Sequence, residues 1–150
     1  MSVNTEAAAR VSSGTHLLFV YGTLMPDVAS RMGVAQRKRL AAQSQRVCQA
    51  VVRGVLYDFG PHPALQLTGA PGDQVHGVLL ALDRPATTFQ WLDPYESIRG
   101  APGFDLYARV LAPVELERGA CAVAWIYDYV APIREARRIE TGRWSPRDRV

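Results

Sequence analysis

The sequence contains few of the residues from which metal centres and disulfide frameworks are built. Its 2 cysteines, Cys48 and Cys121, form no C-x-x-C pair, and its 3 histidines have no ligand-like spacing to the cysteines or to one another. Metal ligands usually recur at short spacings, so we expect no metal site at His16, His62 or His76. Distant cysteines in a reducing compartment are typical of free thiols, and we expect both to have a structural role in the core.

The sequence also lacks long apolar segments. No stretch approaches the roughly 18 consecutive apolar residues that a membrane-spanning helix needs, so no membrane association is expected. Residues 1–15 have neither the basic start nor the apolar middle of a signal peptide, and we interpret them as a disordered lead-in. A cytoplasmic location is therefore the default expectation.

Short motifs that identify several large enzyme classes are missing as well. The chain contains no G-x-x-x-x-G-K-[ST], no G-x-G-x-x-G, no G-x-S-x-G and no H-E-x-x-H. Nucleotide hydrolysis, dinucleotide chemistry, serine hydrolysis and zinc proteolysis therefore lose their usual support. We expect no cofactor.

The charged residues are moderately biased toward the positive sign. The chain carries 17 Lys and Arg against 14 Asp and Glu, for a formal net charge of +3. Two basic clusters could bind phosphates or could lie on a solvated face. Neither has interleaved aromatic residues or a nucleic-acid-binding motif, so the solvated face is favoured and no nucleic acid is expected as a partner. The clusters are Arg31, Arg37, Lys38, Arg39 and Arg46, and Arg134, Arg137, Arg138, Arg143, Arg147 and Arg149.

Apolar patterning predicts an α+β protein with one domain at residues 16–145, followed by a basic tail at 146–150. One predicted helix begins after Asp27, whose side chain would cap it, and fades by about Arg46, and a second covers residues 86–95. A closed or nearly closed sheet with flanking helices fits the order of elements better than alternating βαβ units. The five or six predicted strands cover residues 16–21, 49–57, 65–67, 75–82, 106–116 and 120–130.

The last two predicted strands are expected to form a hairpin through the turn Glu117-Arg118-Gly119. In the second of them, Trp125 and Tyr127 share one face because side chains alternate along a strand. That face is large, and part of it could line a cavity.

The segment Tyr21-Gly22-Thr23-Leu24 follows the first predicted strand and is the first candidate site. Glycine can adopt positive φ and lets the backbone approach a ligand closely, and a helix starting near Asp27 would add free N–H groups. The segment is either a plain tight turn or a cradle for a carboxylate or a developing oxyanion. On its own, it favours the plain turn.

The stretch WLDPYES, at the end of the second predicted helix, is the second candidate site. Asp93 and Glu96 would be neighbours on a helix, although Pro94 restricts the backbone of the residue before it. A glutamate close to Trp91 and Tyr95 could be desolvated, which raises a carboxyl pKa from about 4.3 toward the 6–7 that suits proton transfer. Glu96 is therefore either a proton-transfer group or an ordinary polar residue of a loop.

Six short motifs occur in one order along the chain: FVYGTL, GVLYD, V-x-G-V, LDPYE, Y-A-R-V and TGRW. This series, from about Leu17 to Trp144, resembles the γ-glutamylcyclotransferase-like superfamily, specifically its AIG2-like and γ-glutamylamine cyclotransferase branch. The resemblance implies a small mixed β-barrel with flanking helices and a pocket at one side. It also implies that the Tyr21–Leu24 turn is the substrate cradle, that Glu96 is the catalytic acid/base, and that Tyr127 lines the pocket.

The reaction that the resemblance implies is the cyclisation of a γ-glutamyl amine or peptide to 5-oxoproline and a free amine. The substrate's own α-amine would attack its γ-carbonyl, with Glu96 moving the protons, so no serine or cysteine nucleophile is needed. This sequence departs from the family pattern at MPDVAS after the turn, at His62, and in the length of the 97–105 loop, which all bear on the leaving group. The alternative is a non-catalytic protein that binds a small carboxylate on the same fold.

Overall fold

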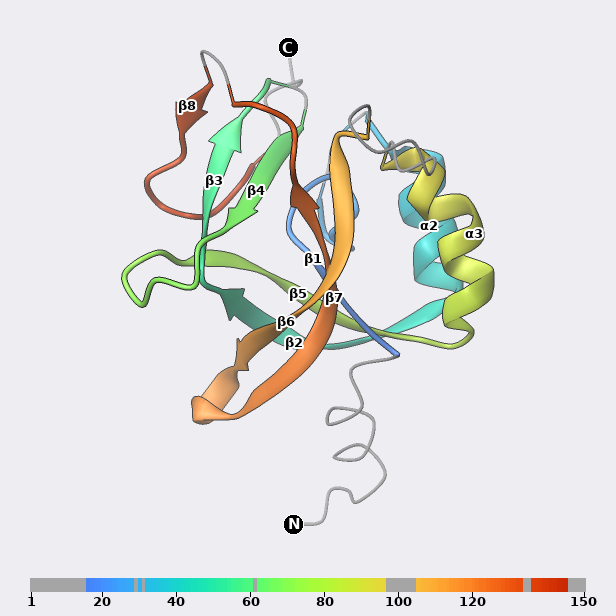
Figure 1. Ribbon diagram of the computed structural model, residues 1–150. Helices are drawn as coiled ribbons and strands as arrows, with labels where there is room; N and C mark the ends of the chain where they lie inside the picture. Colours follow the sequence, from blue (N-terminus) through green and yellow to red (C-terminus); the bar gives the residue numbers. More distant parts are fainter. Residues whose placement is uncertain are drawn as a thin grey trace.

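The computed structural model describes residues 16–28, 30, 32–60, 62–96, 105–133 and 136–145. Five strands close a barrel, which lies at the centre of Figure 1. β1 pairs antiparallel with β5 and parallel with β7, so the barrel is mixed, and the predicted α+β barrel is confirmed. In their order around the barrel, the strands are β1 (Leu17–Val20), β5 (Val75–Leu82), β2 (Ser44–Val52), β6 (Tyr107–Leu116) and β7 (Cys121–Tyr129).

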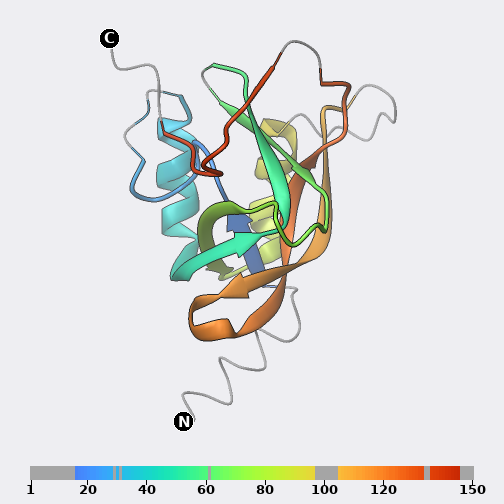
Figure 2. The same cartoon turned by 90° about the vertical axis from the view of Figure 1, so that its left-hand side faces the viewer.

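A second, three-stranded sheet stands beside the barrel, and Figure 2 shows it from its own side. It consists of β4 (Pro63–Leu67), β3 (Gly54–Asp58) and the two-residue β8 (Arg137–Arg138). The run predicted as one strand over residues 49–57 divides at Arg53 into β2 of the barrel and β3 of this sheet. With this division and β8, the described chain has eight strands, more than the five or six predicted.

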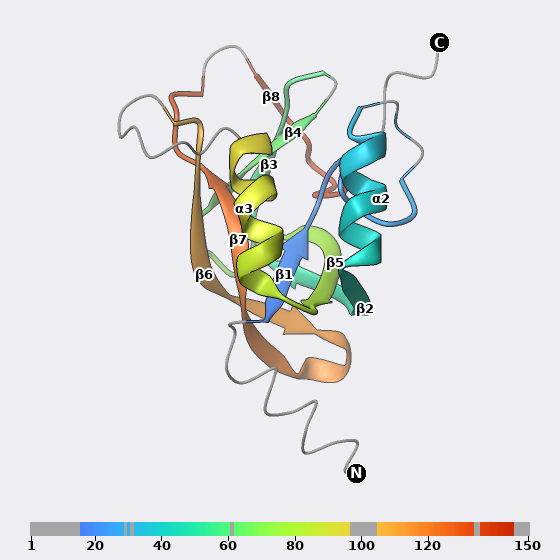
Figure 3. The ribbon, with the colours of Figure 1, turned by 90° about the vertical axis from the view of Figure 1, so that its right-hand side faces the viewer.

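Two helices, α2 (Val34–Ala42) and α3 (Pro85–Tyr95), lie on the same side of the barrel, in front of it in Figure 3. The prediction for α3 is confirmed, but the boundaries predicted for α2 are wrong. Asp27 is exposed in a turn and caps no helix, because α2 begins only after Gly33, whose φ of 77° marks the left-handed region. The helix ends at Ala42 because the following residues pair with β5.

The alternation of side chains divides the apolar residues between two clusters. Along β1, Leu17 and Phe19 point into the barrel, and Leu18 and Val20 join the cluster that packs under the helices. Both faces of β1 are therefore buried, which explains why its sequence is continuously apolar rather than alternating. Complete burial of such a side chain contributes about 1.5–3 kcal/mol to the hydrophobic stabilisation.

The predicted hairpin is confirmed: β6 and β7 pair along their whole length, and the 3₁₀ turn η1 (Glu117–Gly119) joins them. In β7, Ala124 and Ile126 face the barrel interior, whereas Tyr127 belongs to the cluster under the helices and Trp125 packs against that cluster. The second sheet is attached to the same strand, since the Leu67 N–H donates to Asp128 Oδ1 at 3.0 Å.

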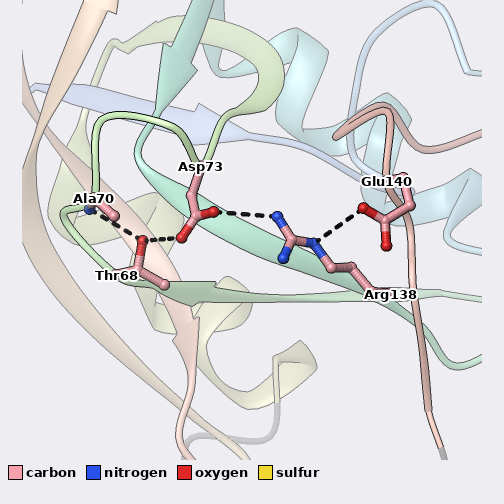
Figure 4. A network of polar contacts seen from close by, with 5 residues as sticks. All are labelled: Thr68, Ala70, Asp73, Arg138 and Glu140. Atoms are coloured by element: carbon pink, nitrogen blue, oxygen red, sulfur yellow. Dashed lines mark hydrogen bonds and ion pairs between the residues drawn. The ribbon is translucent and has the colours of Figure 1, made fainter.

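A polar network fastens β8 to the turn between β4 and β5 (Figure 4). Arg138 contacts Asp73 at 3.1 Å and Glu140 at 3.7 Å, and the Thr68 hydroxyl donates to the other Asp73 oxygen at 2.9 Å. Exposed ion pairs of this kind contribute about 0–1 kcal/mol each to stability. The network therefore adds little to stability and mainly fixes where β8 lies relative to the turn. The chain then leads to Trp144, which is buried against the barrel core.

The two cysteines are free, as expected, but only one fits the predicted core role. Cys48 is half-buried and packs against the barrel core, whereas Cys121 is exposed, which corrects the expectation for that residue. Within the described ranges, no group of three His, Cys, Asp or Glu side chains could hold a metal ion. Neither α2 nor α3 has the length and apolarity to cross a bilayer. The predicted lead-in at 1–15 and tail at 146–150 lie outside the described residues.

Candidate active site

A pocket of about 240 Å³ opens between the segment after β1, the end of α3 and the strands β6 and β7. The residues predicted for the site come from three distant parts of the sequence, and all of them line this pocket. The structure thus brings together Tyr21, Gly22, Thr23, Leu24, Glu96 and Tyr127.

Position 22 needs glycine because a larger residue would collide with Pro63, not because the backbone φ there requires it. A Cβ at this position would lie 2.8 Å from Cγ of Pro63 and 2.9 Å from its Cδ, and positive φ is not required. A hydrogen bond from the Met25 N–H to the Gly22 carbonyl at 3.0 Å closes the turn. Among the residues that the structure describes, none accepts a hydrogen bond from the backbone N–H groups of Gly22, Thr23 or Leu24. The turn therefore keeps three backbone donors that are not used within the described fold.

The hydroxyl of Tyr21 makes a hydrogen bond within the fold. It donates to the backbone carbonyl of Tyr127 at 2.8 Å in a buried position, and burial raises the Tyr21 pKa far above its ordinary value. The Tyr21 side chain thus joins the turn after β1 to β7 as a neutral donor, and its single hydroxyl hydrogen is not available to a ligand.

Arg37 supports the turn from α2. Its guanidinium donates to the carbonyls of Thr23 and Ser30, each at 2.8 Å, and to that of Met32 at 3.3 Å. Sequence reasoning missed this role and assigned Arg37 to a solvated basic face. The carbonyls belong to a loop without regular structure, so the sequence carries no periodic signal for these contacts.

Gly33 connects the start of α2 to the end of α3. A Cβ at Gly33 would lie 2.7 Å from the Tyr95 hydroxyl and 3.3 Å from Thr23 Oγ1, and these two oxygens are 3.3 Å apart. The turn, α2 and α3 therefore meet at one point beside the pocket. The helix N-terminus expected near Asp27 does not contribute to the cradle, since α2 starts seven residues later, at Val34.

Glu96 directly follows α3 and is its C-cap residue. Its N–H donates to the carbonyls of Leu92 at 3.0 Å and Asp93 at 3.1 Å, and its side chain lines the pocket. Burial, and then the negative charge of Asp93, raises the pKa of Glu96 from 4.5 to about 8. The C-terminal end of a helix also disfavours a negative charge. Within the described part of the chain, no side chain or N–H donates a hydrogen bond to this carboxyl group.

Asp93 does not line the pocket, and both of its carboxylate oxygens accept hydrogen bonds. It accepts a hydrogen bond from the Tyr127 hydroxyl at 2.6 Å and two from Arg109, at 2.9 and 3.2 Å. The guanidinium of Arg109 lies 3.7 Å from the ring centre of Phe89 and 4.4 Å from that of Trp125. Sequence reasoning did not single out Arg109, although the Y-A-R-V motif that contains it was part of the family resemblance.

The opposite wall of the pocket comes from the turn before β4. His62 lines it, with its ring centre 5.8 Å from that of Phe59, and the Tyr107 hydroxyl donates to the Pro63 carbonyl at 3.2 Å. His62, one of the positions where the sequence was expected to depart from the family pattern, therefore lies in the pocket wall. The expected long loop at 97–105 lies outside the described residues, except for Asp105.

The family of the chain follows from its sequence. A family model described as gamma-glutamyl cyclotransferase, AIG2-like, matches residues 18–146. The chain therefore belongs to this family, as the order of its motifs predicts. No functionally curated protein matches the sequence.

Solved structures share the fold of this chain. YkqA from Bacillus subtilis is 25% identical over 86% of this chain, with a TM-score of 0.60, and the chain spans 39% of its length. A mouse AIG2-like protein is 20% identical, covering 89% of this chain and 97% of its own, with a TM-score of 0.56. A protein described as gamma-glutamyl cyclotransferase is 17% identical, covering 81% and 70%, with a TM-score of 0.58. The last two identities establish the fold alone.

Proposed function

We propose that the protein cyclises a γ-glutamyl amine or peptide to 5-oxoproline and releases the free amine. The family and the fold support a γ-glutamylcyclotransferase-like function in general. The observation that carries the specific proposal is the shared pocket: the carboxyl group of Glu96, with a pKa of about 8, lines the same cavity as the Tyr21–Leu24 turn.

Glu96 is the proposed general acid/base. As a carboxylate it takes a proton from the α-ammonium of the substrate, and the freed amine attacks the γ-carbonyl carbon. The tetrahedral intermediate then collapses: Glu96 gives its proton to the leaving nitrogen as the C–N bond to the leaving amine breaks. The Glu96 carboxylate takes the second proton that the attacking nitrogen loses on becoming the ring amide, and passes it to the released amine. A carboxyl group whose pKa lies near the working pH suits both directions of transfer.

The Tyr21–Leu24 turn is the proposed cradle for the substrate and for the oxyanion that forms on its γ-carbonyl. Backbone N–H groups that are already in place stabilise such a charge without reorganising. This assignment rests on the three N–H groups that no described residue engages. Neither cysteine lines the pocket, which is consistent with a substrate that supplies its own nucleophile. Holding the γ-glutamyl chain in a folded conformation adds a proximity effect.

The test is incubation with a panel of γ-glutamyl amines and γ-glutamyl dipeptides, followed by mass-spectrometric detection of 5-oxoproline. The proposal predicts product from at least one compound. Glu117→Gln, an exposed position on the η1 turn, is the matched control for Glu96→Gln. Thermal stabilisation by a panel compound without any product would instead support the carboxylate-binding alternative.

A further inference from the structure

The Y-A-R-V motif of β6 has a distinctive arginine that the proposed reaction does not use. Arg109 binds both oxygens of Asp93 through Nε and Nη2, at 2.9 and 3.2 Å, which is the planar two-point geometry that only arginine provides. Its guanidinium also lies over the rings of Phe89 and Trp125. The pair is mostly buried, with side-chain exposures of 23% and 22%, so it is more than a surface ion pair.

We propose that Arg109 is a positioning residue of the pocket: it fixes the Asp93 carboxylate, and Asp93 in turn orients the Tyr127 hydroxyl. The proposal rests on the proposed function only for its kinetic readout. Its structural basis is the unbroken chain of contacts from Arg109 through Asp93 to a side chain that lines the cavity.

The direction of the last hydrogen bond determines what Tyr127 offers to a substrate. A phenol has one hydrogen, and Tyr127 donates it to Asp93 at 2.6 Å, a distance typical of a strong bond to a carboxylate. The Tyr127 oxygen then keeps only lone pairs for any further partner. Such an acceptor suits the α-ammonium of a γ-glutamyl substrate, the group from which Glu96 is proposed to take a proton.

The charges around Glu96 give this arrangement a measurable consequence. Asp93 is the one charged residue in the described chain that acts on its pKa, and Arg109 offsets the Asp93 charge. Burial raises the pKa values of the four neighbouring tyrosines, which therefore stay neutral. These tyrosines are Tyr21, Tyr95, Tyr107 and Tyr127. The other titratable or charged groups that face the pocket or these tyrosines are His62, Arg37, Asp128 and Tyr129.

Four variants test the proposal. Arg109→Met fills the space between the two rings without a charge, Arg109→Lys keeps the charge without the two-point geometry, and Asp93→Asn removes the negative charge. Arg53→Met is the matched control. Like Arg109, Arg53 pairs through Nε with a carboxylate, that of Glu115, but it does so in an exposed position away from the pocket. The readouts are kcat, KM and the pH dependence of kcat/KM, with an NMR titration of the Glu96 carboxyl carbon.

The expected result is that the pKa of Glu96 shifts in opposite directions in Asp93→Asn and Arg109→Met. Loss of the Asp93 charge lowers the Glu96 pKa, and loss of Arg109 leaves that charge uncompensated and raises it, each by about half a pH unit or more. Arg109→Met should lower kcat about 10- to 100-fold with a smaller change in KM, and Arg109→Lys should lie between it and the wild type. Arg53→Met should match the wild type in every readout.

If both kcat and the Glu96 titration of Arg109→Met match the wild type, the proposal is overturned, whatever the result for Asp93→Asn. If Arg109→Met does not fold, Arg109→Lys and Asp93→Asn still decide the outcome. The NMR titration needs no turnover, so it separates this proposal from the proposed function. Absence of 5-oxoproline from the whole panel would contradict the proposed function. The opposite shifts of the Glu96 pKa in Asp93→Asn and Arg109→Met could still be measured and would decide this proposal.

Discussion

The Tyr21 hydroxyl donates a 2.8 Å hydrogen bond to the backbone carbonyl of Tyr127, a residue 106 positions away in the sequence. Tyr127 in turn donates its own hydroxyl hydrogen to Asp93. The turn after β1, the strand β7 and the end of α3 are thereby connected by two consecutive hydrogen bonds. Side chains that line the pocket therefore also connect the elements that form it.

The first prediction concerns this bond. Tyr21→Phe should leave the buried Tyr127 carbonyl without its donor and lower the free energy of unfolding by about 1–3 kcal/mol. Urea titration measures this loss. Tyr57→Phe, at a half-buried position on β3 with no hydroxyl hydrogen bond among the described residues, is the control and should change stability less. Equal stability of Tyr21→Phe and the wild type would show that the bond does not support the pocket.

The second prediction concerns the contact between Gly22 and Pro63. Gly22→Ala would place a methyl group 2.8 Å from the rigid proline ring, so the turn must shift. We expect a destabilisation of about 1–3 kcal/mol, typical of overpacking, together with loss of activity. Gly72→Ala is the control, because a Cβ there meets nothing within 4 Å. Activity and stability like those of the control would contradict this interpretation of the turn.

The third prediction concerns Arg37. Arg37→Gln removes the cation that binds the Thr23 and Ser30 carbonyls and should loosen the turn, raising KM more than it lowers kcat. Lys38→Gln, at the next and exposed position of α2, tests whether loss of a positive charge alone has this effect. Steady-state kinetics of both variants provide the comparison, and equal KM values would argue against a supporting role.

The fourth prediction is a pH dependence of stability. The folded state raises the pKa of Glu96 from 4.5 to about 8, so it holds a proton that the unfolded chain releases. The resulting stabilisation is complete below the unfolded pKa and is lost as the pH rises through the folded pKa. The wild type should therefore lose up to about 1.4 kcal/mol per pH unit in this window relative to Glu96→Gln, which has no carboxyl group to titrate. Unfolding free energies of both proteins at pH 5.5, 7 and 8.5 measure the difference. Parallel pH profiles would exclude the raised pKa.

Much of the fold is predictable from local patterns. Continuous burial makes β1 apolar on both faces, the 3.6-residue period identifies α3, and the turn at Arg118 and Gly119 identifies the hairpin. The start of α2 was not predictable in this way. It depends on Gly33 and on contacts with Thr23 and Tyr95, which only the tertiary structure brings together.

The candidate site was likewise predictable only where local sequence patterns define it. The turn at Gly22 and the carboxyl group of Glu96 carry short motifs whose combination is specific, and the structure places both in one pocket. Arg37 and Arg109 were not predictable from spacing, since their partners lie on other elements and an arginine in a sequence is usually solvated. The buried pairing of Arg109 with Asp93 became evident only from the fold.

The most direct test of the central claim is the rate of 5-oxoproline release by the wild type and by Glu96→Gln, measured with the best γ-glutamyl compound of the panel. The account predicts that Glu96→Gln folds, as judged by its circular dichroism, and is about 10²- to 10⁴-fold slower, the factor that a positioned acid/base supplies. Glu117→Gln should retain the wild-type rate. Equal release of 5-oxoproline by the wild type and Glu96→Gln would contradict the assignment of Glu96 as the proton carrier.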